Sequence, residues 1–430
     1  MKNIWRACPF LFLLLAVSQV GRPANVLEQT DLLFSAVLHN DIKMVQDLLK
    51  RGADVNFRNV NDMTPLALAV RLRRNEIAAL LLDAGADPNV PSKIIFTIGE
   101  EGLTPLLWAV ENGDGETLQL MFEKGGDVNK ASLVGDSPLI CASRNGYAGI
   151  VELLLDKGAK VDYQNPFTKN TALMEAVLAG HSYIIEYLVN HGANIIQRDR
   201  NGNTLLMLAA GSGNLFDVMY LAEKGLKIAA QNEAGDTALH RAIGKLKKTL
   251  YTQEYLVKKG INVNAKNRAG KTPLMEAAYR GYPMSVGHLI KMGADLNSVD
   301  GEGNTALHYV ARGFDKRETI ALDLLRRGAQ VNVKNMEGNT PLIIASGRRD
   351  LSVISALLDN GADVNAQNKN GWSSLMEAAK EGHLPIVKLL TEHGANPSQV
   401  NKDGKTAAEL ANNHKRIQVY EYLKKLAGRD

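Results

Sequence analysis

Histidine and cysteine are the residue types here that most often carry nucleophilic, acid–base or metal chemistry, and neither is arranged for it. The nine histidines include no His-Glu-x-x-His pair, and the two cysteines, Cys8 and Cys141, are too far apart for a Cys-x-x-Cys motif. A metal site is typically marked by such ligands at short, regular spacing. The 38 glycines include no Gly-x-x-x-x-Gly-Lys-Ser/Thr loop for a phosphate. We therefore expect no catalytic residue, no metal ligand and no cofactor.

The composition restricts the classes of partner. Of the 430 residues, 45% are hydrophobic and 22% are charged, which is ordinary for a protein that folds in water. Lysine and arginine total 50 against 46 aspartates and glutamates, a formal charge of +4. This balance is too even for a protein that neutralises phosphates, and 6% aromatic residues leave few platforms for stacking bases. We expect no nucleic acid partner.

The first 18 residues have the pattern of a secretory signal peptide. Lys2 and Arg6 precede an apolar run over residues 7–17, and Ala16-Val17-Ser18 offers small residues for cleavage. The run is shorter than the roughly 20 residues that span a bilayer. We expect residues 1–18 to be the signal, 19–27 a linker, and the mature protein to be periplasmic or secreted by a bacterium, without membrane contact. The alternative is an apolar helix that packs on the body of the protein.

A Thr-x-Leu motif, or a close variant, recurs along the chain with a period near 33 residues. From Thr64 to Thr406 the chain makes ten repeat steps, and ten repeats of 33 residues leave 12 inserted residues to be placed. Seven lie between Gly85 and Thr104, two lie in each of the repeats that begin at Thr237 and Thr305, and one lies before Thr171. A glycine that ends the second apolar stretch keeps the same register. Such self-similarity predicts stacked structural repeats rather than separate globular domains. The motif begins at Thr64, Thr104, Ser137, Thr171, Thr204, Thr237, Thr272, Thr305, Thr340, Ser373 and Thr406.

These motifs resemble the ankyrin repeat family. The match is carried by residues 272–278 (Thr-Pro-Leu-Met-Glu-Ala-Ala), 293–297 (Gly-Ala-Asp-Leu-Asn) and 303–308 (Gly-Asn-Thr-Ala-Leu-His), with equivalents in nearly every unit. The resemblance covers residues 28–430 and implies a mostly α fold, a solenoid of about 12 helix-turn-helix units with projecting β-turns. First helices and turn tips would form its concave side. Residues 421–425 replace the usual repeat ending with polar residues, as expected of a C-terminal cap.

The resemblance implies a binding module, and the variable positions indicate where binding would occur. The residue two positions after the motif leucine should point away from the buried Leu/Ala stripe, and its type varies from unit to unit. The seven-residue insertion adds large apolar residues to one turn. Alternatively, the variable residues pack against neighbouring first helices, and the inserted residues fold back over the second repeat. The predicted partner-binding residues are Ile95, Phe96, Trp108, Glu175, Arg241, Glu276, Tyr309 and Glu377.

Three functions follow from this interpretation. The preferred one is an exported, non-catalytic, monomeric scaffold that binds a protein partner through its concave face and turn tips. The second is a secreted effector that binds a host protein. The third, an ankyrin-bearing enzyme, would need a catalytic group, and Cys141 merely occupies the position of Trp108 and Glu175 in other units. The basic segment 245–248 is interpreted as a solvated loop between helices.

Overall fold

The computed structural model describes residues 24–59, 62–92, 102–313 and 317–427, with side chains from residue 29 to 426. Within these ranges, the regular secondary structure consists of 24 α-helices and one isolated β-bridge between Gln367 and Ser373. The chain divides into two compact units, residues 1–200 and residues 201–430. The mostly helical repeat architecture predicted from the motifs is confirmed.

Unit one contains five helix pairs. In each pair the first helix begins at the second residue of the Thr-x-Leu motif, except that the first pair lacks the motif. Because no anchor marks its start, the sequence places the beginning of the repeats at residue 28, whereas α1 already begins at Ala24. The helices are α1 (Ala24–His39), α2 (Ile42–Lys50), α3 (Pro65–Arg71), α4 (Asn75–Asp83), α5 (Pro105–Asn112), α6 (Gly115–Glu123), α7 (Pro138–Asn145), α8 (Ala148–Asp156), α9 (Ala172–Ala179) and α10 (Ser182–Asn190).

Unit two contains seven helix pairs of the same kind. Two of its first helices are unusually short, α13 with four residues and α19 with six. The helices are α11 (Leu205–Ser212), α12 (Leu215–Glu223), α13 (Ala238–Arg241), α14 (Lys248–Lys258), α15 (Pro273–Arg280), α16 (Pro283–Lys291), α17 (Ala306–Arg312), α18 (Glu318–Arg326), α19 (Pro341–Ser346), α20 (Leu351–Asp359), α21 (Ser374–Glu381), α22 (Leu384–Glu392), α23 (Ala407–Asn413) and α24 (Ile417–Ala427).

The motif residues start and bury the first helices. The Thr104 hydroxyl accepts a hydrogen bond from the backbone N–H of Leu107 at 3.1 Å, which caps α5, and Pro105 occupies the first helical position. Such caps satisfy donors that a helix N-terminus leaves unpaired. The small residues Ala277 and Ala278 are fully buried, so neighbouring first helices can approach closely. Each motif therefore specifies both the start of a helix and its buried face.

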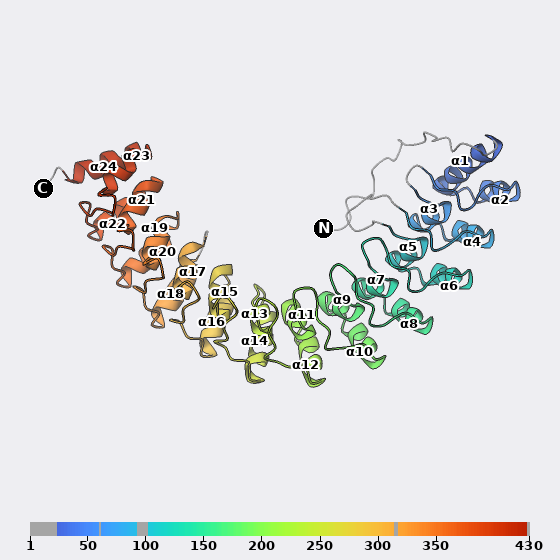
Figure 1. Cartoon of the computed structure of the whole chain (residues 1–430), viewed down its shortest axis with the longest axis horizontal. Coiled ribbons are helices and arrows are strands. Elements are labelled where there is room, and N and C mark those ends of the chain that lie inside the picture. The colour runs from blue at the N-terminus through green and yellow to red at the C-terminus, as the bar shows by residue number, and fades with distance from the viewer. Residues whose placement is uncertain (1–23, 60–61, 93–101, 314–316, 428–430) are drawn as a thin grey trace. The chain divides into compact units, whose positions relative to one another are not determined.

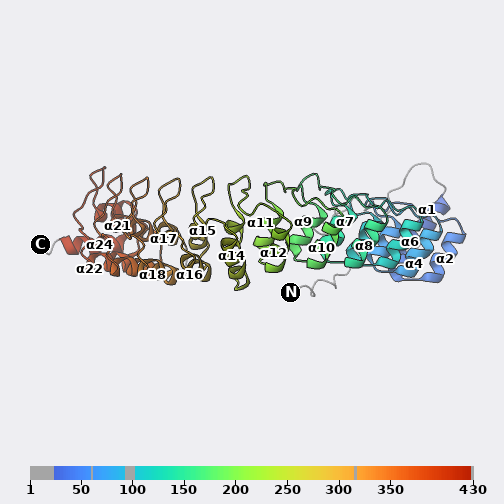
Figure 2. The ribbon, with the colours of Figure 1, turned by 90° about the horizontal axis from the view of Figure 1, so that it is seen from below.

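Within each unit of the chain the helices form two rows. First helices pack on first helices, and second helices pack on second helices of the next pair. In unit two, Figure 2 shows the turns that connect successive pairs projecting along one edge, while the short turns inside each pair lie on the opposite edge. We call these the turn edge and the helix-loop edge. The first-helix row and the turn edge together form the face on which binding is predicted.

Where the Gly-Ala-Asp-Val-Asn segment keeps its last asparagine, this side chain joins one pair to the next. The Asn332 side-chain amide donates to the Gly361 carbonyl at 3.0 Å, and its carbonyl accepts from the Asp363 N–H at 2.8 Å. Both bonds connect residues about one repeat apart, so the asparagine acts between pairs and not within one. The same double contact is made by Asn56, Asn89, Asn129, Asn264 and Asn365.

The turn that precedes α13 lacks this asparagine, and introducing it there should stabilise the protein. Ala229 is exposed and occupies the equivalent turn position. Replacing Ala229→Asn should add a bond to the Gly260 carbonyl and one from the Asn262 N–H. Asn297 precedes another pair with two extra residues and still accepts from a backbone N–H of that pair, so the insertion is compatible with the contact. We expect the free energy of unfolding in urea to rise by about 1 kcal/mol.

The reverse substitution provides the matched control for this prediction. Asn332→Ala removes the same two contacts from an intact joint of unit two, and we expect a loss of about 1 kcal/mol in the same urea experiment. If Ala229→Asn raises the free energy of unfolding but Asn332→Ala does not lower it, or if only Asn332→Ala has an effect, the asparagine amide is not what joins successive pairs.

Candidate partner-binding surface

Two positions on each first helix, not one, shape the variable surface. The predicted position lies two residues after the motif leucine. In the structure, the side chain five residues after the leucine of one pair contacts that position on the next pair. Three contacts show this arrangement: Arg71 lies 5.3 Å from the ring centroid of Trp108, Arg144 Nε lies 3.0 Å from Glu175 Oε2, and the rings of Tyr279 and Tyr309 meet edge to face at 5.9 Å.

In unit one these contacts bury the two predicted residues Trp108 and Glu175, which are 7% and 9% exposed. Glu175 also accepts from the Asn170 side-chain amide at 2.8 Å, and Arg144 donates to Asp136 at 2.8 Å. Both residues therefore pack against neighbouring first helices, as the alternative interpretation of the sequence allowed. Their contribution to partner binding stays a prediction.

In unit two the contacts form a cluster of cations and aromatic rings, which we call the α15–α17 cluster. It consists of Lys271, Tyr279, Tyr309 and Arg312. The Lys271 ammonium lies 4.9 Å from the Tyr309 ring centroid and 5.4 Å from that of Tyr279, and Arg312 lies 5.9 Å from Tyr309. Tyr279 is half exposed, whereas Tyr309 is buried. Partly exposed aromatic and cationic side chains of this kind are frequent energetic anchors in protein interfaces.

A carboxylate holds the buried ring of this cluster in place. The Tyr309 hydroxyl donates to Asp300, which precedes α17 in the adjoining turn. Burial raises the pKa of Tyr309, and the hydrogen bond to Asp300 raises it further, so the phenol stays protonated and keeps donating. This side-chain contact, together with the ion pair between Arg312 and Glu302 at 3.5 Å, connects the turn edge with the first-helix row.

A hollow of about 410 Å³ adjoins the α15–α17 cluster at Arg312. It lies beside α19, where the helix stops at Ser346 and Gly347 follows, so that no side chain fills the space. Burial raises the pKa of Glu377 in its wall, and Lys380 Nζ lies 4.0 Å from this carboxylate. Three carboxylates and two guanidinium groups surround an isoleucine pair. The lining residues are Arg312, Glu337, Asn339, Ile343, Ile344, Gly347, Arg348, Glu377 and Glu381.

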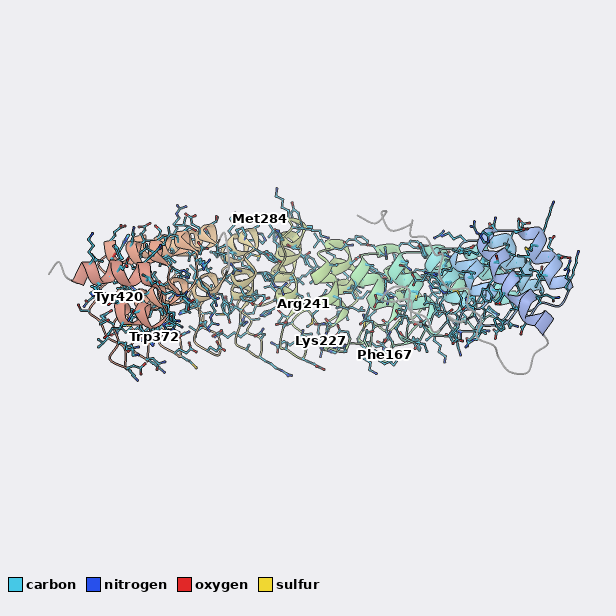
Figure 3. The ribbon with its side chains drawn as sticks, turned by 90° about the horizontal axis from the view of Figure 1, so that it is seen from above. Phe167, Lys227, Arg241, Met284, Trp372 and Tyr420 are labelled. Carbon is cyan, nitrogen blue, oxygen red and sulfur yellow. The ribbon has the colours of Figure 1, made fainter. Side chains whose placement is uncertain are left out.

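Four predicted residues lie on first helices of unit two: Arg241 on α13, Glu276 on α15, Tyr309 on α17 and Glu377 on α21. Arg241 is exposed, and Figure 3 shows it between the two edges of the unit. Glu276 is half-buried and forms an ion pair with Arg280 on its own helix. The four side chains belong to one row; Tyr309 is part of the α15–α17 cluster, and Glu377 lines the hollow.

Two predicted residues, Ile95 and Phe96, lie outside the described residues. The structure also shows contributors that the sequence interpretation missed, namely Lys271, Tyr279, Arg312, Glu337 and Glu381. Tyr279 and Arg312 could have been found, because they lie one helical turn after the position considered, where residue type varies just as much. Glu337 belongs to a turn, and no repeat position distinguishes it from other polar turn residues.

Cys141 and the possible metal ligands were the residues considered for chemistry. Cys141 is buried, and burial raises the pKa of its thiol, with the Glu111 carboxylate adding to the effect. Among the described residues, no three His, Cys, Asp or Glu side chains are grouped closely enough to hold a metal ion. No helix in the described ranges has the length and apolarity needed to cross a bilayer.

Comparison with known proteins gives a family match along almost the whole chain. The family model described as ankyrin repeats (3 copies) matches residues 7–92, 93–165, 161–232, 218–300, 274–368 and 342–430. These ranges contain every described helix pair, including the pairs that carry the α15–α17 cluster and the hollow.

Curated relatives match over shorter stretches. The chain is 41% identical to the human 2-5A-dependent ribonuclease over 97 residues, which are 22% of this chain and 12% of the ribonuclease. It is 33% identical to a putative ankyrin repeat protein of fowlpox virus over 125 residues, 28% of this chain and 35% of the viral protein. It is 30% identical to the human mitochondrial disaggregase over 179 residues, 40% of this chain and 23% of that protein. The match thus covers about a third or less of each of these relatives.

Proposed function

We infer the function of this chain from one premise: it belongs to the ankyrin repeat family. Ankyrin repeats generally mediate protein–protein interaction, and we assign this chain the role of a non-catalytic scaffold that binds a protein partner. The partner would lie on the first-helix row and the turn edge of unit two. The observation that carries this assignment is the continuity of the α15–α17 cluster with the hollow beside α19.

The chemistry of this surface fits a folded protein or peptide with mixed charge. Tyr279 offers a half-exposed ring, and Lys271 lies close enough to keep a cation at its face. The hollow offers carboxylates from Glu377 and Glu381 beside a guanidinium from Arg312. A partner that places a basic side chain in the hollow and an apolar one on Tyr279 would satisfy both features.

Charge reversal on this surface should release the partner without unfolding the protein. We expect Arg241→Glu combined with Glu381→Lys to weaken binding at least tenfold, because both side chains are accessible on the first-helix row. The partner is first identified by affinity purification and mass spectrometry, and its dissociation constant is then measured by calorimetry. Circular dichroism should show unchanged helix content.

The matched control changes the same two residue types on the second-helix row. Arg326 on α18 and Glu392 on α22 are both exposed, and Arg326→Glu with Glu392→Lys leaves the net charge unchanged as well. This variant should bind the partner as tightly as the parent protein. Equal losses in both variants would place the partner elsewhere and would contradict the assignment.

Export from the cytoplasm is the second part of the proposal, supported by Lys2, Arg6 and the apolar run over residues 7–17. Fractionation of producing cells tests it directly. Recovery of a shortened chain in the periplasmic fraction supports a periplasmic scaffold, and recovery in the culture medium supports the secreted alternative. Recovery of the full-length chain in the cytoplasm would exclude both.

A further inference from the structure

The loop that connects α13 to α14 exposes a basic and apolar segment on the helix-loop edge of unit two. Lys245, Leu246, Lys247 and Lys248 are all exposed, and the Leu246 side chain is 60% accessible. No ion pair is recorded for the three lysines within the described part of the chain. The loop and the first residue of α14 therefore present three cationic side chains and one large apolar side chain to their surroundings.

Buried polar side chains hold this loop in a defined position. The Gln253 amide on α14 donates to the Ala242 carbonyl at 3.1 Å and to the Ser285 hydroxyl on α16 at 3.0 Å. Ser285 in turn donates to the Gly244 carbonyl at 2.9 Å. Gln253 and Ser285 are completely buried, which is costly for polar groups unless they are hydrogen-bonded.

Other pairs place an apolar residue at the position of Gln253, as α22 does with Val387 and α16 does with Val286. The departure from the repeat pattern at Gln253 is thus explained by the loop that it supports together with Ser285. A merely solvated insertion would need no such support from two neighbouring helices. Side chains of unit two therefore specify the conformation of this loop.

Three further apolar side chains flank the loop on adjacent second helices. Phe216 on α12 and Tyr251 on α14 are 59% exposed, and Met284 on α16 is 44% exposed. Lys248 lies beside Gly213 in the short turn between α11 and α12, and Met284 immediately precedes the Ser285 that contacts the loop. Figure 3 shows Met284 on the edge of unit two opposite Lys227 and Trp372. We call these residues and the loop the helix-loop patch.

The lysines do not stabilise the helix that follows them. Lys247 and Lys248 lie at the N-terminus of α14, which has no side-chain cap and no acidic residue in its first turn. The positive end of the helix dipole disfavours cations at this position by a few tenths of a kcal/mol or more. The charges therefore weaken α14 slightly, and local stability gives no reason for them.

We propose that the helix-loop patch binds the surface of an anionic lipid bilayer. Lysines near such a surface contribute about 1 kcal/mol each, and exposed Leu, Phe, Tyr and Met side chains enter the interfacial region. Lysine is depleted in protein–protein interfaces, and this patch has three lysines and no arginine, so its charge suits lipid better than a protein partner. This role differs from the expectation of no membrane contact. It is independent of the partner surface, which lies on the first-helix row and the turn edge.

Co-sedimentation of the purified full-length chain with vesicles tests the proposal. We expect binding to vesicles of equal parts phosphatidylcholine and phosphatidylglycerol, much weaker binding to phosphatidylcholine alone, and loss of binding at high salt. The variant Lys245→Glu/Lys247→Glu/Lys248→Glu should lower the partition coefficient at least thirtyfold, and Leu246→Asp about tenfold. The apolar run over residues 7–17 is the same in every variant, so it cannot produce these differences.

The charge-reversal variant should be as stable to heat as the parent chain or slightly more stable, because glutamates suit the N-terminus of α14. A control variant, Lys369→Glu/Lys402→Glu/Lys405→Glu, changes the net charge equally at exposed turn positions of unit two and should still bind vesicles. Absence of sedimentation with anionic vesicles, or equal loss in both triple variants, would overturn the proposal. So would retained vesicle binding in the patch variant together with loss of the protein partner, which would assign the patch to that partner.

Discussion

Acidification from about pH 7 to about pH 4 should lower the free energy of unfolding by about 3 kcal/mol through His308 alone. This imidazole is completely buried; its Nδ1 accepts from the Thr305 N–H at 3.0 Å, and its Nε2 donates to the Asn339 carbonyl at 3.1 Å. Burial lowers the pKa of His308 to about 4, against an ordinary value of 6.5. Arg312 lowers this pKa further, whereas the bond to Asn339 and the Asp300 carboxylate oppose the shift.

The sign of the effect follows from proton binding. Between pH 4 and 6.5 the unfolded chain binds a proton at His308 that the folded chain excludes, so stability rises with pH across this window. The contribution is complete above pH 6.5 and is lost progressively as the pH falls toward 4. Protonation would also place a donor at Nδ1, where the Thr305 N–H already donates. Urea unfolding followed by tryptophan fluorescence measures the loss.

Other groups titrate in the same range, so a variant without the imidazole is needed. His308→Met introduces the residue that α15 and α21 carry at the same position, Met275 and Met376. The variant should be less stable at neutral pH because it loses both hydrogen bonds, and its stability should depend less steeply on pH. The stability gap between parent and variant should therefore narrow by about 3 kcal/mol on acidification. Parallel curves would mean that His308 is not the group responsible.

The repeat spacing was sufficient to predict the fold because each motif residue acts locally. Thr104 caps the helix that begins at the next residue by accepting from the Leu107 N–H, and Pro105 is the first residue of that helix, so both effects are set by immediate neighbours. The insertion after Thr237 was located by counting alone. Counting could not show that α13 would shorten to four residues, because the helix end depends on hydrogen bonds from Gln253 and Ser285 to the loop.

The binding surface was predicted less completely because it depends on contacts between pairs. Tyr309 was chosen for its position on one helix, but its burial comes from Tyr279 on the preceding pair and from Asp300 in a turn. The hollow exists because α19 ends at Ser346, whereas the repeat count there is regular. Position within a repeat therefore predicts which residues face outward. It does not predict which neighbours then cover them.

Gly270→Ala should cost about 3 kcal/mol of unfolding free energy, because this turn leaves no room for a side chain. Gly270 has φ +77°, and a Cβ atom there would lie 2.5 Å from the backbone nitrogen of Gly301 in the next turn. That N–H donates to the Ala269 carbonyl at 2.9 Å. The left-handed conformation costs an alanine about 1–2 kcal/mol, and separating the two turns also removes this hydrogen bond.

Gly293→Ala isolates the contribution of the contact between turns. Gly293 has a similar φ of +88°, but nothing lies within 4 Å of the Cβ position, so only the conformational cost of about 1–2 kcal/mol applies. The Gly270 variant should also displace Asp300, whose backbone would lie about 3 Å from the new Cβ, and thereby disturb the Tyr309 hydroxyl bond. We therefore expect Gly270→Ala to weaken partner binding as well as stability, whereas Gly293→Ala affects stability alone. If the two variants unfold at the same urea concentration and bind the partner equally, contact between successive turns neither stabilises unit two nor positions the α15–α17 cluster.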